Sequence, residues 1–204
     1  MLTLYHAPFS RSTRIVALIH ELGLQDRVQI EPVTVTRPDG SGGRDPKNPH
    51  PEGKVPLLVH DDAVIRESVA IALYLSELAP ETGLARPVGA AYRGPFLSWL
   101  SWYSGVLEPV IVLTLCELEH PMLTTTFRGL PEATERLADA LKGNSYLMGD
   151  DFTIADLIIA STFSTLPQLM PDNPDIQGWV ARCANRPAMQ AALAYDAELM
   201  AATA

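Results

Sequence analysis

Strand signals are confined to the first part of this 204-residue chain. Apolar residues alternate over Leu2–Tyr5 and, less regularly, over Val28–Val35, and helical spacing over Ser12–Leu22 separates the two. Two further apolar runs, Leu57–Val59 and Ala63–Ile65, flank a polar tripeptide, which predicts a tight hairpin. With a helix after the hairpin, the order is β-α-β followed by β-β-α. This order predicts a small α/β domain at the start of the chain.

The helix predicted over Glu67–Leu78 carries apolar residues on nearly every side. A helix that is apolar all round has to be covered all round. A position between the sheet and a second domain would cover it. The sequence therefore predicts that more structure follows.

Beyond residue 80 no convincing strand pattern is found. Proline and glycine recur at positions 80, 83, 87 and 89, which is typical of a linker. We expect an α/β domain over residues 1–80, a linker over 81–88 and an all-helical domain over 89–204. The predicted helices of the second domain are Tyr92–Glu119, Pro131–Leu141, Thr153–Leu166, Ile176–Asn185 and Pro187–Met200.

Thr153 and Asp156 have the spacing of a capping box at the start of a helix. The helix behind them is apolar on most faces, which predicts a place in the centre of the helical domain. We interpret both residues as structural, because an acid in a first turn usually serves the helix dipole and cap.

The net charge and the rare residues exclude several classes of function. Fifteen basic against 24 acidic residues give a net charge of −9, which disfavours nucleic acid as a partner. No apolar run approaches the roughly 20 residues of a membrane span, and no signal peptide follows Met1. The two cysteines, Cys116 and Cys183, are expected to be buried thiols in a reducing cytoplasm. The five histidines lack metal-ligand spacing and are expected at the surface or in loops, so we predict no metal.

The strongest local motif is the hexapeptide Gly53–Leu58, with the sequence GKVPLL. A cis bond before Pro56 would turn the backbone of Val55 outward, free to pair with an extended peptide-like ligand. The alternative is an ordinary trans proline at the edge of a strand, and the dipeptide alone favours it. The motif thus leaves both structures open.

Glu67 and Ser68 open the helix that follows the hairpin. The free N–H groups of a helix N-terminus attract anions, and a serine hydroxyl there adds a donor. Ser68 can equally be a plain helix cap. One residue can serve both purposes.

Three segments together resemble one family. The segment NPHPEGKVPLLVHDDAVIRESVAIALYL resembles the glutathione-binding half of the cytosolic glutathione transferases, and GDDFTIADLIIASTF and WVARCANRPAMQAAL resemble two signatures of their helical domain. The resemblance covers nearly the whole chain, in the family's order. It implies a thioredoxin-like N-terminal domain followed by an all-helical C-terminal domain.

The resemblance also implies how glutathione would be held. Val55 would pair through its backbone with the cysteinyl part, with Pro56 in cis. Glu67 and Ser68 would hold the γ-glutamyl carboxylate and amine, and Lys54 is a candidate for the glycyl carboxylate. A tripeptide anion would then meet a backbone edge, a helix N-terminus and a lysine.

The catalytic hydroxyl is expected in the loop after the first strand, where family members carry Tyr, Ser or Cys. A hydroxyl that donates a hydrogen bond to the glutathione sulfur favours the thiolate. Position in the loop favours Ser10, as in a Ser-type, bacterial-like member, with Ser12 the main rival and Tyr5 a third candidate. No cysteine precedes Cys116, which disfavours disulfide exchange.

The resemblance implies a transferase that joins glutathione, as co-substrate, to a small hydrophobic electrophile. The electrophile pocket is expected between the domains, with Phe9 and Tyr103 as candidate wall residues. A glutathione-dependent isomerase, dehalogenase or lyase is the first alternative, and a non-catalytic glutathione-binding regulatory module is the second. A homodimer is expected from the family and from the apolar helix over Glu67–Leu78.

Overall fold

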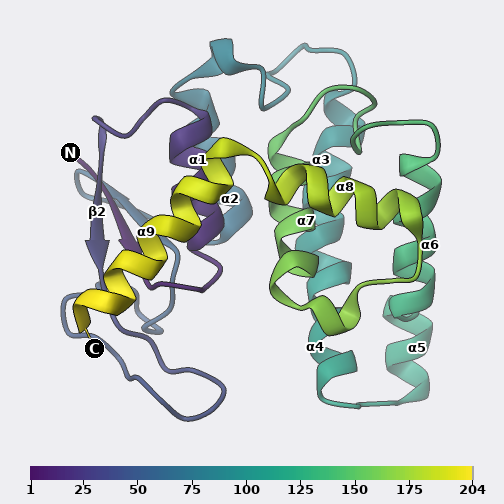
Figure 1. Cartoon of the computed structure of the whole chain (residues 1–204), viewed down its shortest axis with the longest axis horizontal. Helices are drawn as coiled ribbons and strands as arrows, with labels where there is room; N and C mark the ends of the chain where they lie inside the picture. The colour runs from purple at the N-terminus through teal and green to yellow at the C-terminus, as the bar shows by residue number, and fades with distance from the viewer. Residues whose placement is uncertain (204) are drawn as a thin grey trace. The chain divides into compact units, whose positions relative to one another are not determined.

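The computed structural model describes residues 1–203 (Figure 1). The chain forms two compact units. Met1–Thr82 and the segment from Asn185 onward make the first, and Gly83–Ala184 makes the second. The change from one unit to the other near residue 82 falls at the start of the expected linker. The C-terminal end differs from expectation, because the last helix belongs to the first unit.

The first unit is built on a four-stranded sheet with the order β2-β1-β3-β4. Its strands are β1 (Leu2–His6), β2 (Val28–Pro32), β3 (Leu57–His60) and β4 (Ala63–Ile65). β1 runs parallel to β2 and antiparallel to β3, and β3 and β4 form the predicted hairpin. Pro32 ends the edge strand β2, where its missing N–H costs no ladder bond. The predicted β-α-β then β-β-α order is confirmed.

Three helices accompany the sheet. α1 (Thr13–Glu21) and α2 (Ser68–Glu77) are the predicted ones, and α2 ends near the short 3-10 helix η1 (Pro80–Thr82). α9 (Pro187–Thr203) lies along α1, as Figure 1 shows. Its buried residues are Met189, Ala192 and Asp196, which recur at helical spacing and form the face toward the first unit. The expectation that this helix completes the helical domain therefore does not fit the structure.

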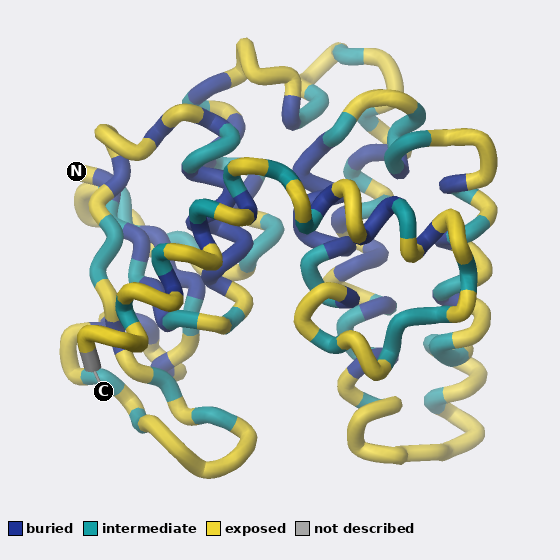
Figure 2. The backbone as a smooth tube through the Cα atoms, viewed as in Figure 1, coloured by how far each residue is buried: buried dark blue, intermediate teal, exposed yellow. Residues whose placement is uncertain are grey.

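The second unit is all-helical, as predicted. Figure 2 shows its buried residues concentrated on the inner helices, and α7 is buried at every position from Ile154 to Ala160. The predicted central place of this helix is confirmed. The elements are α3 (Arg93–Trp102), the π-helix η2 (Tyr103–Leu107), α4 (Glu108–Leu115), α5 (Pro121–Phe127), α6 (Leu130–Leu141), α7 (Ile154–Thr165), the 3-10 helix η3 (Pro167–Leu169) and α8 (Pro174–Ala184).

The sequence pattern did not predict α5. Its seven residues contain three successive threonines, whose β-branched side chains disfavour helix, and it shows no buried residue. His120 nevertheless caps it, since its ring nitrogen accepts from the N–H of Met122 at 3.1 Å. Pro121 occupies the first position, where a helix tolerates proline.

α3, η2 and α4 form one continuous helical segment, Arg93–Leu115. By length and mean hydropathy (1.3) alone this segment could cross a membrane, although polar residues such as Ser101 and Glu108 interrupt it. A core helix of a soluble domain passes the same test. Phe96, Leu100 and Leu107 of this segment are buried inside the second unit, which is typical of a core helix.

The capping box at the start of α7 is present, and its acid does more than cap. Thr153 accepts a helix N–H, and its own main-chain N–H donates to Asp156 at 2.9 Å. The other carboxylate oxygen of Asp156 accepts from the N–H of Leu147 at 2.8 Å and the indole of Trp179 at 3.0 Å. Asp156 is fully buried, and burial raises its pKa against the effect of these donors. One carboxylate thus joins α7, α8 and the loop before α7.

Replacing Asp156 by alanine should destabilise the protein strongly, because three buried N–H groups would lose their acceptor. We expect a loss of about 3–5 kcal/mol in the free energy of unfolding. Thr153→Ala, which removes only the cap hydroxyl, should cost about 1 kcal/mol. Urea denaturation of both variants measures the difference. Equal losses would show that Asp156 acts as a cap alone.

Candidate active site

The loop between β1 and α1 presents the hydroxyl of Ser10. This side chain is half-buried, and its Oγ donates to the carbonyl of Ala7 at 2.7 Å. It accepts the main-chain N–H of Ser12 at 3.1 Å. These local bonds hold Ser10 just before the first turn of α1, where the helix dipole favours negative charge. The hydroxyl is therefore fixed in place yet partly open to a ligand.

Ser12, the main rival of Ser10, is fully buried. Its Oγ accepts the N–H of Ala7 at 3.1 Å and lies 2.8 Å from Nδ1 of His6 and 2.7 Å from the Oγ of Ser10. Tyr5 lies on β1 at a half-buried position that alternates with the buried Leu4 and His6. Of the two serines, Ser10 is the one that a ligand can reach.

His6 is buried, contrary to the expectation that the histidines lie at the surface or in loops. Its Nε2 lies 2.8 Å from Oδ1 of Asp196, a residue of α9 that sequence reasoning did not select. The second oxygen of Asp196 accepts from the N–H of Phe9 and from the hydroxyl of Thr13, both at 2.6 Å. Burial raises the pKa of Asp196, but these hydrogen bonds outweigh it and hold that pKa below its usual value.

The segment before β3 presents the backbone of Val55. The Val55–Pro56 peptide bond is cis, as the resemblance implies. Val55 is half-buried, and its main chain forms no hydrogen bond within residues 1–203. Just before it, the side-chain amide of Asn48 donates to the carbonyl of Lys54 at 3.0 Å. Asn48 thus orients the strand start from a loop that showed no periodic pattern.

His50 supports the same segment and is also buried. The Nδ1 of its ring accepts the main-chain N–H of Glu52 at 3.0 Å, and the main-chain N–H of His50 donates to Oδ1 of Asn48. Burial lowers the pKa of His50, which favours the neutral ring that this acceptor role requires. His50 is therefore a structural support of the loop.

Lys54 is exposed and pairs with a neighbouring acid. Its Nζ donates to Glu52 at 2.5 Å, and this bond raises the pKa of Lys54. A surface pair of this kind is weak and exchanges readily. Lys54 can therefore leave Glu52 for a carboxylate of a ligand.

The start of α2 combines a strained residue with a held hydroxyl. Glu67 is its N-cap residue, with φ 67° and ψ 124°, a conformation that costs a non-glycine residue about 1–3 kcal/mol. Ser68 follows, and its Oγ accepts from Nη2 of Arg14 at 3.1 Å. Arg14 is buried in the first turn of α1, so a guanidinium lies beside the N-terminus of α2.

Strand pairing brings these segments to one edge of the sheet, the one at which β1 and β4 end and β3 begins. The end of β1 pairs with the start of β3, since Tyr5 lies opposite Leu57. The end of β4 reaches the same edge, because Ile65 lies opposite Leu58. The loop with Ser10, the backbone of Val55 and the start of α2 therefore meet there. A backbone edge, a helix N-terminus and a hydroxyl suit a peptide anion that carries a reactive group.

Comparison with known proteins agrees with this arrangement. The models of the glutathione S-transferase N-terminal and C-terminal domains match residues 4–83 and 101–187. Glutathione S-transferase 3 of Zea mays is 30% identical over 95% of this chain and 93% of that protein. The chain belongs to the glutathione S-transferase family. Glutathione S-transferase GstA of Escherichia coli O157:H7 is 29% identical over 72% of this chain and 76% of that protein. A glutathione transferase structure from Methylococcus capsulatus superposes with a TM-score of 0.78 at 28% identity, and the match covers 97% of this chain and 99% of that one.

The candidate wall residues of this glutathione S-transferase lie in different units. Phe9 is 51% exposed in the loop of the first unit, whereas Tyr103 is 1% exposed in the core of the second. Little of Tyr103 is thus open to a substrate, and the role of both residues as pocket wall stays a prediction.

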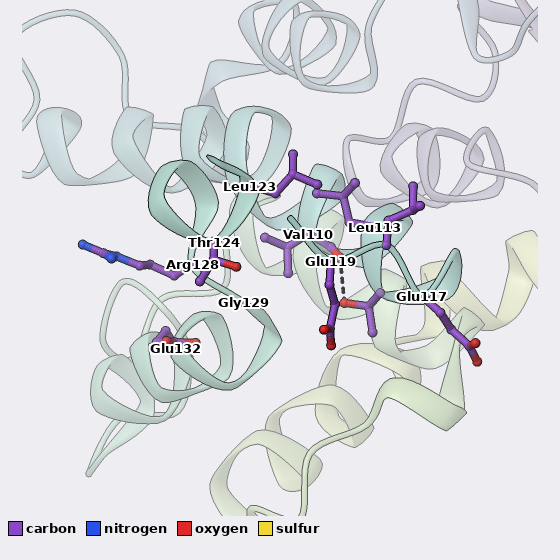
Figure 3. Close-up of a pocket in the computed structure, with 11 residues that line it drawn as sticks. Val110, Leu113, Glu117, Glu119, Leu123, Thr124, Arg128, Gly129 and Glu132 are labelled. Carbon is purple, nitrogen blue, oxygen red and sulfur yellow. Dashed lines mark hydrogen bonds between the residues drawn. The ribbon is translucent and has the colours of Figure 1, made fainter. Parts of the chain in front are cut away.

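The second unit of the transferase has a pocket of its own, of about 720 Å³ (Figure 3). It lies between α4, α5 and α6 and includes neither candidate wall residue. Its lining mixes leucines with acids such as Glu117 and Glu132. Across residues 1–203, no group of three or more His, Cys, Asp or Glu side chains is arranged to hold a metal.

Acid should weaken the first unit through Asp196. Because the folded pKa of this acid is lowered, its stabilising effect is present above the pKa of an unfolded aspartate, about 3.9, and is lost as the pH falls through the lower folded value. Urea denaturation below about pH 4 should therefore show a steeper loss of stability for the wild type than for Asp196→Asn. Parallel profiles would contradict a lowered pKa.

Proposed function

We propose that this protein is a glutathione transferase that joins the glutathione thiolate to a small hydrophobic electrophile in the cytoplasm. The observation that supports the proposal is the strand pairing, which brings the ends of β1 and β4 beside the start of β3 and so the segments of Ser10, Val55 and Ser68 to one edge of the sheet. Catalysis then rests on proximity and on activation of the thiol, with the sulfur as nucleophile. Membership of the family supports the same function.

Three anchors would hold the tripeptide. The backbone of Val55, which lacks a partner within residues 1–203, would pair with the cysteinyl residue in the manner of an added strand. Glu67 and Ser68 would hold the γ-glutamyl amine and carboxylate, and the guanidinium of Arg14 beside Ser68 supports an anion there. Lys54 would exchange Glu52 for the glycyl carboxylate.

The hydroxyl of Ser10 would activate the thiol. A free thiol has a pKa near 8.5, so little thiolate exists at neutral pH. A hydrogen bond from Ser10 to the sulfur, next to the N-terminus of α1, stabilises the charged form. The half-buried position of Ser10 and the full burial of Ser12 support this choice.

The alternatives would use the same anchors. A glutathione-dependent isomerase, dehalogenase or lyase differs in its electrophile, and a regulatory module would bind glutathione without turnover. The reachable hydroxyl of Ser10 favours an enzyme over the module. The net charge of −9 speaks against nucleic acid as a partner.

We also propose a homodimer. Within one chain α2 buries only Ile71, Ala72, Leu75 and Ser76, while Val69 and Leu73 stay half-buried and Ala70 is exposed. A second copy would cover part of this helix.

Ser68→Ala should weaken glutathione binding, because the γ-glutamyl carboxylate and Arg14 both lose a hydrogen-bonding partner. We expect a loss of about 1–3 kcal/mol in calorimetry. The control is Ser98→Ala. Within residues 1–203 the exposed hydroxyl of Ser98 on α3 bonds only the carbonyl of Gly94 in its own helix, so its loss should leave binding unchanged. A wild type that shows neither heat nor a thermal shift at millimolar glutathione would refute the proposed function.

Ser10→Ala should leave glutathione affinity nearly unchanged, since the anchors lie elsewhere. The pKa of the bound thiol should rise toward its value in solution, which lowers kcat/KM for a reactive aryl halide about ten- to a hundredfold near neutral pH. The loss should shrink at high pH, where the thiol ionises unaided. The pH–rate profile measures this, with Tyr5→Phe beside it. If Tyr5→Phe raises the pKa and Ser10→Ala does not, the hydroxyl is misassigned.

A further inference from the structure

Four side chains form a continuous line of hydrogen bonds inside the first unit. Asp196 of α9 lies 2.8 Å from His6, His6 lies 2.8 Å from Ser12, and Ser12 lies 2.7 Å from Ser10. Asp196, His6 and Ser12 are each 0% exposed, and only Ser10 reaches the half-buried surface. The line therefore runs from a buried carboxylate to the hydroxyl proposed to meet the glutathione sulfur.

The contacts of this line fix how many protons it needs. Three short contacts have to be bridged by a proton, namely Ser12 to Nδ1 of His6, Ser12 to Ser10, and Ser10 to the carbonyl of Ala7. The two hydroxyls supply only two protons. The longer contact from Ser12 to the same carbonyl, at 3.2 Å, would use the same Ser12 proton and does not change the count.

The imidazole ring supplies the third proton. A neutral ring leaves one contact without a proton in either tautomer. With its proton on Nε2, toward Asp196, Nδ1 is bare and one of the three contacts is not bridged, and with its proton on Nδ1, toward Ser12, Nε2 is bare against the carboxylate of Asp196. A doubly protonated ring donates from Nε2 to Asp196 and from Nδ1 to Ser12, and every contact is satisfied. The carboxylate of Asp196 also accepts from Phe9 and Thr13, so it is arranged to be ionised and to balance the ring's charge.

We propose that Asp196 and His6 are positioning residues that orient the proton of Ser10 toward the glutathione sulfur. With the ring doubly protonated, His6 donates to Ser12 and Ser12 donates to Ser10. The proton of Ser10 is then not used within the line. Ser10 donates it to the carbonyl of Ala7 until a glutathione thiolate replaces that carbonyl as the acceptor. No covalent bond is made or broken in this relay. The inference rests on the proposed function, because it deepens the role of Ser10.

A purely structural role for the same contacts makes different predictions. In that case Asp196 and His6 would serve only to fasten α9 to the sheet. A second pair already fastens this region, since Arg186, just before α9, binds Glu21 at the end of α1 through two bonds of 2.6 and 2.8 Å. Glu21→Gln is therefore a matched control that weakens the attachment without touching the line to Ser10.

Nitrogen NMR of the histidine rings tests the proton count in the free protein. The signal of His6, assigned by its loss in His6→Asn, should show both ring nitrogens protonated near neutral pH in the wild type and in Glu21→Gln. Asp196→Asn should show a neutral ring. A bare Nδ1 in the folded wild type would overturn the proposal, and this readout does not require glutathione.

Ultraviolet titration of the bound thiolate tests the effect on chemistry. Asp196→Asn should raise the apparent pKa of the bound thiol by about 1 and lower kcat about tenfold, with KM for glutathione unchanged. Glu21→Gln should lose stability but keep the pKa of the wild type. An unchanged pKa in a folded Asp196→Asn would overturn the relay. A wild type that binds no glutathione would instead overturn the proposed function.

Two conservative replacements of His6 separate the roles once more. The amide of His6→Asn lies at the position of Nδ1 and can donate to Ser12, whereas that of His6→Gln lies at the position of Nε2 and keeps the contact with Asp196. The relay predicts that His6→Asn retains the larger kcat and the lower thiol pKa. A merely structural role predicts the reverse, because His6→Gln keeps the attachment of α9. Better activity in His6→Gln would refute the proposal.

Discussion

The arrangement of the candidate site depends on the buried carboxylate of Asp196. A buried charge without partners costs several kcal/mol, so its place is set by the donors that surround it. Those donors come from His6 at the end of β1, from Phe9 in the loop and from Thr13 at the start of α1. One side chain of the last helix therefore fixes the turn that carries Ser10. The left-handed conformation of Phe9, φ 51°, is held by the same contact.

The other parts of the site depend on the sheet. Because β1 pairs with β3 and β3 with β4, the start of β3 and the end of β4 are brought beside the end of β1. Arg14 then joins two helix starts, since it extends from the first turn of α1 to Ser68 on α2. The strained backbone of Glu67 lies at this junction. Residues distant in sequence are thus held at one edge by main-chain pairing and one guanidinium.

The sequence predicts those parts of the site that local patterns encode. The hairpin and the helix start at Glu67–Ser68 lie in short segments whose residue types predict them, and the structure has both. The cis bond before Pro56 is also present, but only the family resemblance implied it, because the dipeptide alone favours a trans bond. The partners His6 and Asp196 are 190 residues apart, and neither belongs to a motif. The pattern of α9 resembles that of any other helix, so its attachment to the first unit could not be predicted. Asn48 and His50 lie in a loop without periodicity, so no local pattern predicted that they support the segment before β3.

Different parts of the chain would then determine the affinity for glutathione and the reactivity of its thiol. The proposed anchors Val55 and Ser68 are placed by the sheet and by Arg14, all within the first 82 residues. The proton of Ser10 is placed through His6 by a residue of the last helix. Changes in α9 can therefore tune the thiol without disturbing the surface that holds the tripeptide. A fold that binds glutathione with a constant set of anchors can vary its chemistry through such distant contacts, which separates the evolution of binding from that of rate.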